Sequence, residues 1–332
     1  MRFKKFRPAA AFIIMLGAVV LSVPTLLSWS FHYGAPIVSG QFPVTVNPQH
    51  KTIVENVLVN AFLESKQSPF QAAVANTGAA FWNVFEWTAT TISGAPWYQS
   101  IAGVAGIHNR LVTITPGMRK EQVANAFADA LAWNNSQKQE FMTAAASATL
   151  PLAEGSFVPG VYTVTRGTTP AAAQTLVNKR FSEEILSHYG TTTAQIVSVN
   201  QALTVASLIE REAGGSDDMR MISGIIWNRL FANMNLQIDA TVQYVKANSA
   251  SATSWWPKVV PADMSRKSSY NTYLHKGLPP TPIANPSVAA VLAALNPRDT
   301  SCMFYFHDNA GQFHCSDTYA EHVALLKKYF GR

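Results

Sequence analysis

The chain has 332 residues, which is long enough for a membrane anchor and about two domains. Only 13% of the residues are charged and 48% are hydrophobic, so the composition excludes a disordered chain. The formal net charge is +6, but four basic residues lie within the first seven positions and leave about +2 for the remainder. So small a positive charge gives no reason to expect a nucleic-acid partner.

The N-terminus has the pattern of a membrane anchor. Its basic residues precede an apolar stretch over about residues 9–29, which as a helix can cross a hydrocarbon core of about 30 Å. Basic flanks stay in the cytoplasm, so the rest of the chain is expected outside the cytoplasmic membrane. A cleaved signal peptide is the alternative, because Ser28 and Ser30 are small residues at the two recognition positions. The length of the apolar stretch favours the anchor.

The next two regions differ in how clearly they can be interpreted. Residues 31–107 show no recognisable domain pattern; the aromatic segment 81–87 could stack on sugar rings, but such a face more often belongs to a core. Residues 112–118 are followed by a helical pattern through Val123, Phe127 and Leu131. We therefore take residues 108–170 as a connecting region.

The segment 203–212 predicts a helix that ends in a catalytic carboxylate. In a helix Glu212 lies one turn beyond Leu208 and two turns beyond Val205, so it continues their apolar face. Glu210 lies about 200° further round the helix and points elsewhere. Partial burial raises the pKa of a carboxyl, as a group that both donates and accepts a proton near neutral pH requires. The alternative is an amphipathic helix that ends in solvated charges.

The rest of the chain predicts an α+β fold. A helix opening near Ser216 is followed by a helix over 288–295, for which Asn285-Pro286 would supply the N-cap and a first-turn proline. Residues 303–306 and 312–315 predict a hairpin, and a capping box from Thr318 to Glu321 predicts a final helix that buries Leu325, Leu326 and Tyr329.

Two histidines and two cysteines near this hairpin raise the question of a zinc site. A two-residue turn at 308–309 would place Cys302 opposite Cys315, with His307 and His314 together on the other face. Four ligands could not then converge, and no metal is expected. A Cys302–Cys315 disulfide suits an exported domain, although the sequence leaves its oxidation open.

An ordered series of motifs resembles one known family. The motifs are Ile-Glu-Arg-Glu at 209–212, Asn-Arg-Leu at 228–230, Leu-Gln-Ile-Asp-Ala-Thr at 236–241, Tyr-Asn-Thr-Tyr at 270–273 and Gly-Leu-Pro-Pro-Thr-Pro-Ile-Ala-Asn-Pro at 277–286. Their order and spacing resemble the MltG/YceG-type endolytic murein transglycosylases. Residues 112–131 resemble the family's strand, turn and helix before the catalytic part, and residues 154–162 resemble a further family segment. In contrast, Ile238, Ala240 and Phe313 depart from the family pattern.

This resemblance implies a fold and a division of the chain. The expected fold is α+β, with an N-terminal membrane anchor, a small LysM-like subdomain and a mixed α/β catalytic domain that carries the glutamate on a helix. The expected divisions are the anchor (1–30), an exported region (31–107), the LysM-like or connecting region (108–170) and the catalytic domain (171–332).

The resemblance also implies an activity. Glu212 would act as acid and then as base to cut MurNAc–GlcNAc bonds inside peptidoglycan strands and leave 1,6-anhydro-MurNAc ends. The implied substrate-binding residues are Asn228, Gln237, Asp239, Asn271 and Tyr273. No cofactor or metal is expected; the implied partners are glycan strands, the cytoplasmic membrane and peptidoglycan synthases.

Two other classes of function remain open at this point. A muramidase would use Asp239 as a second carboxylate that activates water opposite Glu212. A non-catalytic glycan-binding scaffold is conceivable because Ile238 and Ala240 depart from the family pattern.

Overall fold

The computed structural model describes residues 40–65, 109–143, 153–215, 218–248 and 254–331. The expected anchor and the aromatic segment 81–87 lie outside the described residues. Within those ranges, no helix is long and apolar enough to cross a membrane.

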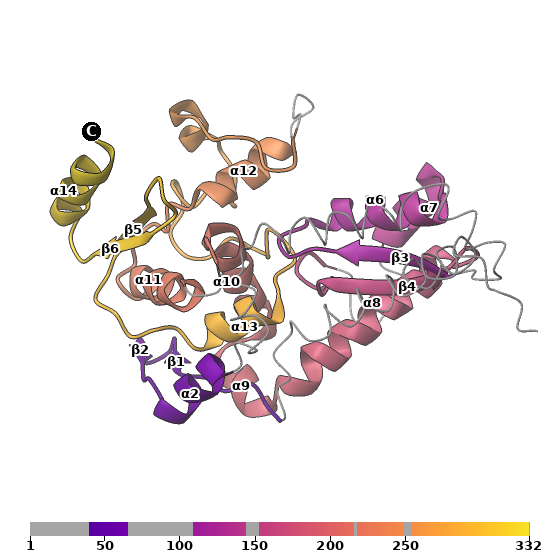
Figure 1. Cartoon of the computed structure of the whole chain (residues 1–332), viewed down its shortest axis with the longest axis horizontal. Coiled ribbons are helices and arrows are strands. Elements are labelled where there is room, and N and C mark those ends of the chain that lie inside the picture. Colours follow the sequence, from indigo (N-terminus) through magenta and orange to yellow (C-terminus); the bar gives the residue numbers. More distant parts are fainter. Residues whose placement is uncertain (1–39, 66–108, 144–152, 216–217, 249–253, 332) are drawn as a thin grey trace, which may run out of the picture.

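Helix α10 (Val199–Glu212) lies at the centre of the molecule and carries the predicted glutamate at its last position. It packs against α11 (Met219–Phe231), α12 (Asp239–Ala247) and α13 (Val288–Leu295), as Figure 1 shows. Its N-cap Ser198 accepts a hydrogen bond from the backbone N–H of Gln201, which satisfies one of the free donors of the first turn. Every residue from Ala202 to Ile209 is buried, so the helix is enclosed on all sides rather than amphipathic.

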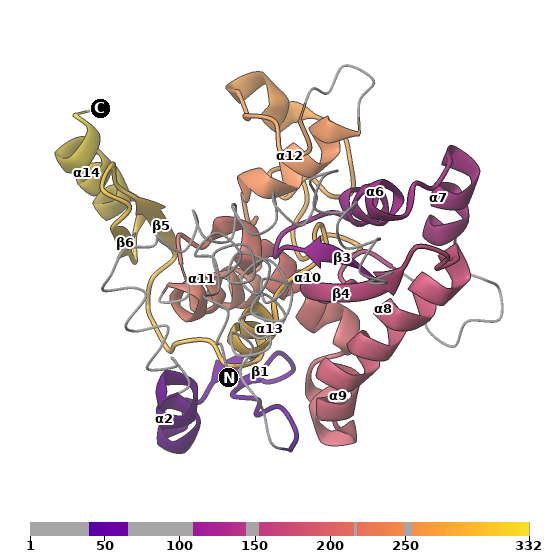
Figure 2. The same ribbon diagram turned by 45° about the vertical axis from the view of Figure 1, so that its right-hand side comes forward.

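A second unit lies beside this helical core, at the opposite end of the molecule from the C-terminal hairpin in Figures 1 and 2. Strands β3 (Asn109–Ile114) and β4 (Gly160–Thr165) pair antiparallel, and between them in sequence come α6 (Lys120–Leu131) and α7 (Asn135–Met142). The predicted strand, turn and helix up to Leu131 are therefore confirmed. This unit has its own core, in which the rings of Phe127 and Phe141 pack at a tilt with their centroids 5.0 Å apart.

Helix α8 (Pro170–Glu184) connects the two cores. Ala173 and Val177 pack in the core of the β3–β4 unit, and Phe181 packs one turn later in the core around α10. The other described elements that precede the C-terminal hairpin are β1 (Val46–Asn47), β2 (Thr52–Ile53), α2 (Val57–Ser65), α9 (Thr191–Ile196) and two short 3₁₀ helices at Leu186–His188 and Pro261–Ser265.

Asn285 joins the two units at the point where the sequence predicted a helix cap. Its side-chain oxygen accepts the backbone N–H groups of Gly155 and Phe157, and its amide nitrogen donates to the carbonyl of Met118. The N-cap of α13 is instead Ser287, whose hydroxyl accepts the N–H of Ala290. The predicted helix at 288–295 is confirmed, but Asn285 holds the inter-unit junction, because the backbone N–H groups that it satisfies come from the other unit.

Glu154 lies buried in the same junction. One carboxyl oxygen accepts the backbone N–H of Lys120 and the amide of Asn285, and the other has no hydrogen-bond partner among the described residues. Burial, followed by the negative charge of Glu121, raises the pKa of Glu154 to about 8. The carboxyl is therefore protonated in the folded protein at neutral pH.

The Glu154→Gln variant should reduce the pH dependence of stability. The folded pKa of Glu154 lies above its unfolded value, so its contribution is complete below about pH 4.5 and is lost as pH rises through about 8. In that window the free energy of unfolding should fall by up to about 1.4 kcal/mol per pH unit. Urea unfolding between pH 4.5 and 8 should show a smaller fall in the variant; an unchanged slope would contradict the assignment.

The C-terminal hairpin has a different register from the one predicted. Strands β5 (Phe304–His307) and β6 (Phe313–Ser316) are joined by a turn over residues 308–312, whereas direct pairing of Cys302 with Cys315 would require a two-residue turn at 308–309. His307 therefore opposes Phe313, and His314 opposes Phe306. The two histidines lie on opposite faces, and the prediction that they share one face is wrong.

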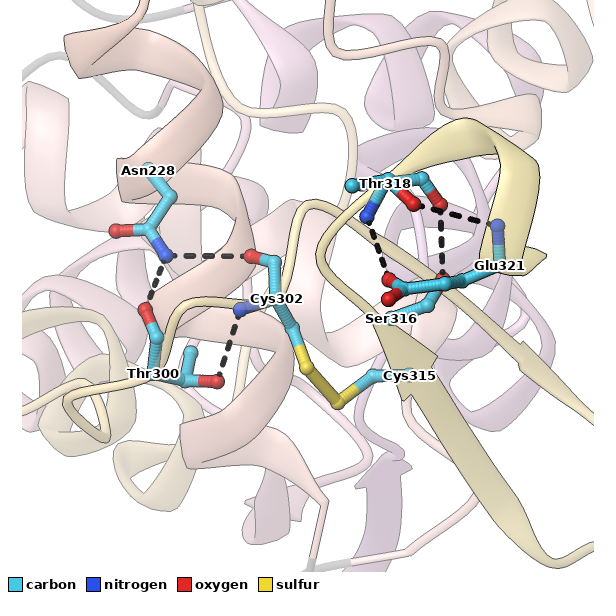
Figure 3. The surroundings of a disulfide bond; sticks show 7 residues. All are labelled: Asn228, Thr300, Cys302, Cys315, Ser316, Thr318 and Glu321. Carbon is cyan, nitrogen blue, oxygen red and sulfur yellow. Dashed lines mark hydrogen bonds between the residues drawn. A yellow bond between two sulfur atoms is a disulfide. The ribbon is translucent and has the colours of Figure 1, made fainter.

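The disulfide forms in spite of this change of register. Cys302 and Cys315 are bonded with their Cα atoms 5.8 Å apart, within the ordinary range, although Cys315 pairs across the strands with Tyr305 (Figure 3). Cys302 lies before β5 begins, and Asn228 on α11 donates to its carbonyl. The bridge therefore fixes the hairpin beside α11.

Helix α14 (Tyr319–Phe330) closes the chain. Its capping box is confirmed, because the Thr318 hydroxyl accepts the N–H of Glu321 and the Glu321 carboxylate accepts the N–H of Thr318 (Figure 3). The predicted burial of Leu325, Leu326 and Tyr329 is wrong: the two leucines are half-buried and Tyr329 is 37% exposed. The helix packs on the outer face of a hairpin of two strands, which covers little of it.

Candidate active site

A cavity of about 420 Å³ opens beside the C-terminal end of α10. It lies between that helix end, the N-terminus of α12 and the hairpin β5–β6. The structure brings Glu212, Gln237, Asp239 and Tyr273 together there. The cavity is lined by Glu212, Arg229, Leu236, Gln237, Asp239, Tyr273, Phe304, Tyr305, Phe306, His307, Tyr319 and His322.

Glu212 is held in the cavity by two hydrogen-bond donors. The Tyr305 hydroxyl donates to its carboxylate at 2.8 Å, and the backbone N–H of Ala240, in the first turn of α12, also donates to it. Burial raises the pKa of Glu212, and the negative charge of Asp239 raises it further. The two hydrogen bonds and the positive charge of Arg211 lower it by less. Glu212 is thus a carboxyl whose proton is retained to higher pH than in water.

Asp239, Gln237 and Tyr273 also line the cavity. The Tyr273 hydroxyl donates to Asp239 at 2.6 Å. Gln237 has a left-handed backbone with φ of 53°, and its N–H donates to the carbonyl of Thr272. This bond ties the Gln237 loop to the Tyr-Asn-Thr-Tyr motif and leaves the Gln237 side chain exposed at the cavity.

Asn228 and Asn271 lie outside the residues that line the cavity. The Asn228 amide donates to the carbonyls of Thr300 and Cys302, and so ties α11 to the segment before β5 (Figure 3). Asn271 is fully buried, and its amide donates to the carbonyls of Met264 and Arg266. Both side chains satisfy backbone carbonyls and do not line the cavity.

Two further residues, Tyr305 and Arg229, complete the site. Tyr305 reaches Glu212 from β5, as described above. Arg229 is buried, donates to the carbonyls of Met303 and Leu236, and lies 5.1 Å from the ring centroid of Phe304. Arg229 therefore joins the hairpin to the Gln237 loop. The strand alternation of 304–307 was a signal for Tyr305, but the hairpin's place beside α10 was not visible in the sequence.

Glu210 points away from Glu212, as the helical phase predicted. It is nevertheless not a solvated charge, because its carboxylate accepts the N–H and the hydroxyl of Ser287, at 2.9 and 2.7 Å. Burial raises the pKa of Glu210, and these two hydrogen bonds partly offset the effect. Glu210 thus attaches α10 to the N-terminus of α13.

The described residues contain no cluster of three or more histidine, cysteine, aspartate or glutamate side chains that could hold a metal ion. The two cysteines are consumed by the disulfide. Each histidine of the hairpin has a separate carboxylate partner: His307 bonds Asp218, and His314 bonds Asp308.

Comparison with known proteins gives the family. The YceG-like family matches residues 90–328, and the chain belongs to this family. A crystal structure of a yceG-like protein from Listeria monocytogenes superposes with a TM-score of 0.57 at 27% identity, over 65% of this chain and 75% of that one. The mixed helix and strand fold that was predicted is therefore shared with a YceG-like protein.

Two curated relatives carry a functional name. The endolytic murein transglycosylase of Bacillus subtilis (strain 168) is 37% identical over 133 residues, which are 40% of this chain and 35% of that protein. The endolytic murein transglycosylase of Streptococcus pneumoniae serotype 2 (strain D39 / NCTC 7466) is 28% identical over 155 residues, which are 47% of this chain and 28% of that protein. The chain thus matches about a third of the length of these relatives.

Proposed function

We propose that this protein is an endolytic murein transglycosylase. The observation that carries the proposal is the partly buried Glu212 carboxyl, whose pKa is raised and which two donors hold at the wall of a cavity. A carboxyl in this state can donate a proton near neutral pH and can take one back afterwards. The names of the curated relatives supply the substrate class, peptidoglycan.

In the proposed reaction Glu212 acts twice. Its proton passes to the glycosidic oxygen as the bond from that oxygen to C1 of MurNAc breaks. The resulting carboxylate then takes the proton of the MurNAc 6-hydroxyl while that oxygen bonds to C1 and closes a 1,6-anhydro ring. Glu212 ends as it began, protonated, and no water is consumed, so one carboxyl suffices where hydrolases use two.

The other predicted residues divide into two roles. Gln237, Asp239 and Tyr273 lie at the cavity, where amide, carboxylate and phenol groups can bind sugar hydroxyls and acetamido groups. For Asn228 and Asn271 we propose a role through the backbone, since their amides bind backbone carbonyls of the segments that lead to β5 and to the Tyr-Asn-Thr-Tyr motif. Tyr305 is proposed as a positioning residue that fixes the orientation of the Glu212 carboxyl.

A muramidase is the second candidate, and one observation favours it. Asp239 lies in the same cavity as Glu212 and close enough to raise its pKa, so two carboxylates are available. The hydrogen bond from Tyr273 gives Asp239 an alternative role as part of a binding surface. Digestion of purified cell-wall sacculi separates the candidates: a transglycosylase releases fragments with anhydro ends, a muramidase releases reducing ends, and a glycan-binding scaffold releases nothing.

We further propose a single-pass protein of the cytoplasmic membrane with its catalytic part outside, where it meets glycan strands and peptidoglycan synthases. The basic residues before the apolar stretch support this orientation. The β3–β4 sheet with two intervening helices supports a LysM-like unit. Retention in membranes after a salt wash tests the anchor; recovery of a shortened soluble chain would contradict it.

A further inference from the structure

A second polar side chain of β5 faces the cavity beside Glu212. Tyr305 and His307 are two residues apart on one strand, so their side chains share a face and lie about 6.6 Å apart along it. Tyr305 bonds Glu212, and His307 lines the same cavity with a side chain that is 24% exposed. The imidazole is therefore about one sugar ring away from the group that would cleave the glycosidic bond.

Asp218 fixes the orientation of this imidazole. The Nε2 atom of His307 lies 2.5 Å from a carboxylate oxygen of Asp218, which also accepts the backbone N–H of Gly214 at 2.9 Å. A side chain added at Gly214 would lie 3.1 Å from the same Nε2, so the ring packs on the turn that follows α10. Asp218 acts as the acceptor, and this assigns the Nε2 proton to the bond between them.

The second ring nitrogen is left for a ligand. The Nδ1 atom of His307 has no hydrogen-bond partner in the described part of the chain, and it is not one of the buried polar atoms. Phe313 contacts the ring edge-on, with centroids 5.5 Å apart, and contributes no polar group. An imidazole whose Nε2 carries the proton presents a lone pair at Nδ1, which accepts a hydrogen bond.

We propose that Nδ1 of His307 accepts a hydrogen bond from a hydroxyl or acetamido N–H of the sugar bound next to the scissile bond. This inference rests on the proposed function, since the ligand is the glycan strand itself. Asp218 and Gly214 hold the ring before substrate arrives, so little side-chain entropy is lost on binding. His307 is thus a specificity residue that sets the register of the strand relative to Glu212.

The same hairpin offers a matched control. His314 also has its Nε2 on a carboxylate, that of Asp308 at 2.9 Å. It lies on the opposite face, where its ring centroid is 4.1 Å from that of Tyr329, and it does not line the cavity. The two histidines therefore share one pairing chemistry and differ in access to the proposed ligand.

Two substitutions separate binding by Nδ1 from the structural tie to Asp218. The His307→Gln side chain reaches the position of Nε2 and can keep the bond to Asp218, but it has no polar atom at the position of Nδ1. The shorter His307→Asn side chain places a polar atom at the position of Nδ1 but cannot reach Asp218. Calorimetric titration with uncrosslinked glycan strands should be made in the Glu212→Gln chain, which prevents cleavage. We expect His307→Gln to weaken binding roughly five- to tenfold, the loss of one hydrogen bond, and His307→Asn to restore most of the affinity. His314→Gln should bind like the parent.

Each other result overturns the proposal. Retained binding in His307→Gln with loss in His307→Asn would mean that only the tie to Asp218 matters. Equal loss in both variants, no loss in either, or a matching loss in His314→Gln would remove the role of Nδ1. If the Glu212→Gln parent binds no glycan strands and the unsubstituted protein releases no fragments from sacculi, the proposed function itself is wrong. The proposed ligand of His307 is then wrong as well.

Discussion

Replacing Glu212 by glutamine is expected to abolish glycan cleavage while the fold remains intact. The substitution removes the acidic group that donates the first proton and accepts the second in the proposed mechanism, and it keeps the size of the side chain. The Tyr305 hydroxyl can still donate to the amide oxygen, so the cavity should keep its shape. Loss of a general acid and base costs on the order of 10² to 10⁴ in rate. Release of soluble fragments from sacculi measures the loss, and the thermal unfolding midpoint checks the fold.

Glu210→Gln is the matched control, because it makes the same chemical change one helical half-turn away. Its amide oxygen can still accept the hydrogen bonds of Ser287, so the attachment of α10 to α13 should persist. We expect Glu210→Gln to cleave glycan strands within about tenfold of the unsubstituted rate, far above the residual rate of Glu212→Gln. An inactive Glu210→Gln together with an active Glu212→Gln would show that the helical phase argument assigned the wrong glutamate.

Tyr305→Phe is expected to slow cleavage roughly tenfold, since a hydrogen bond to a charged group is lost and the carboxyl is free to rotate. The hydrogen bond from Tyr305 lowers the pKa of Glu212, because it favours the ionised form. Without it the pKa rises further. The first step needs protonated Glu212, so the alkaline limb of kcat/KM against pH should move to higher pH.

The pH profile distinguishes this role from simple packing. Tyr273→Phe provides the comparison, since its hydroxyl bonds Asp239 and not Glu212. It should alter KM more than the position of the alkaline limb. A limb that stays in place in Tyr305→Phe would contradict the assignment of Tyr305 as the residue that positions Glu212.

The helix that carries Glu212, and the side of that helix on which Glu212 lies, could be predicted from the sequence because both depend on local periodicity. Spacing of 3.6 residues places Glu212 and Glu210 on different sides of any helix, whatever surrounds it. The burial of Glu210 by Ser287 depends instead on a residue 77 positions away, which no local pattern shows. The helical pattern therefore predicts the orientation of the two glutamate side chains, but it does not show what surrounds Glu210.

The amide side chains of the motifs show a second limit of prediction from sequence. Gln237 and Asn271 both lie in motifs, and their residue types suit sugar binding equally well. The structure exposes Gln237 at the cavity and buries Asn271 completely, because the turn before Tyr273 uses the Asn271 side chain to satisfy backbone carbonyls. Whether an amide faces ligand or backbone is decided by tertiary packing, which composition does not encode.

The hairpin shows why Tyr305 escaped prediction. Its existence followed from alternating residues and a turn signal, but its register depends on the length of the turn. A turn over 308–312 moves every cross-strand partner and separates His307 from His314. The disulfide tolerates the change because Cys302 lies before the strand begins, where the backbone is not bound by strand pairing.

The central claim is that the nucleophile is the MurNAc 6-hydroxyl and not water. Digestion of sacculi in ¹⁸O-labelled water, followed by mass spectrometry of the fragments, tests it most directly. A transglycosylase leaves an unlabelled 1,6-anhydro end, lighter by one water than a hydrolysed end. Asp239→Asn should lower the rate without changing this product, since Asp239 is assigned to substrate positioning. Reducing MurNAc ends that carry the label, and that disappear in Asp239→Asn, would contradict the account and identify a muramidase.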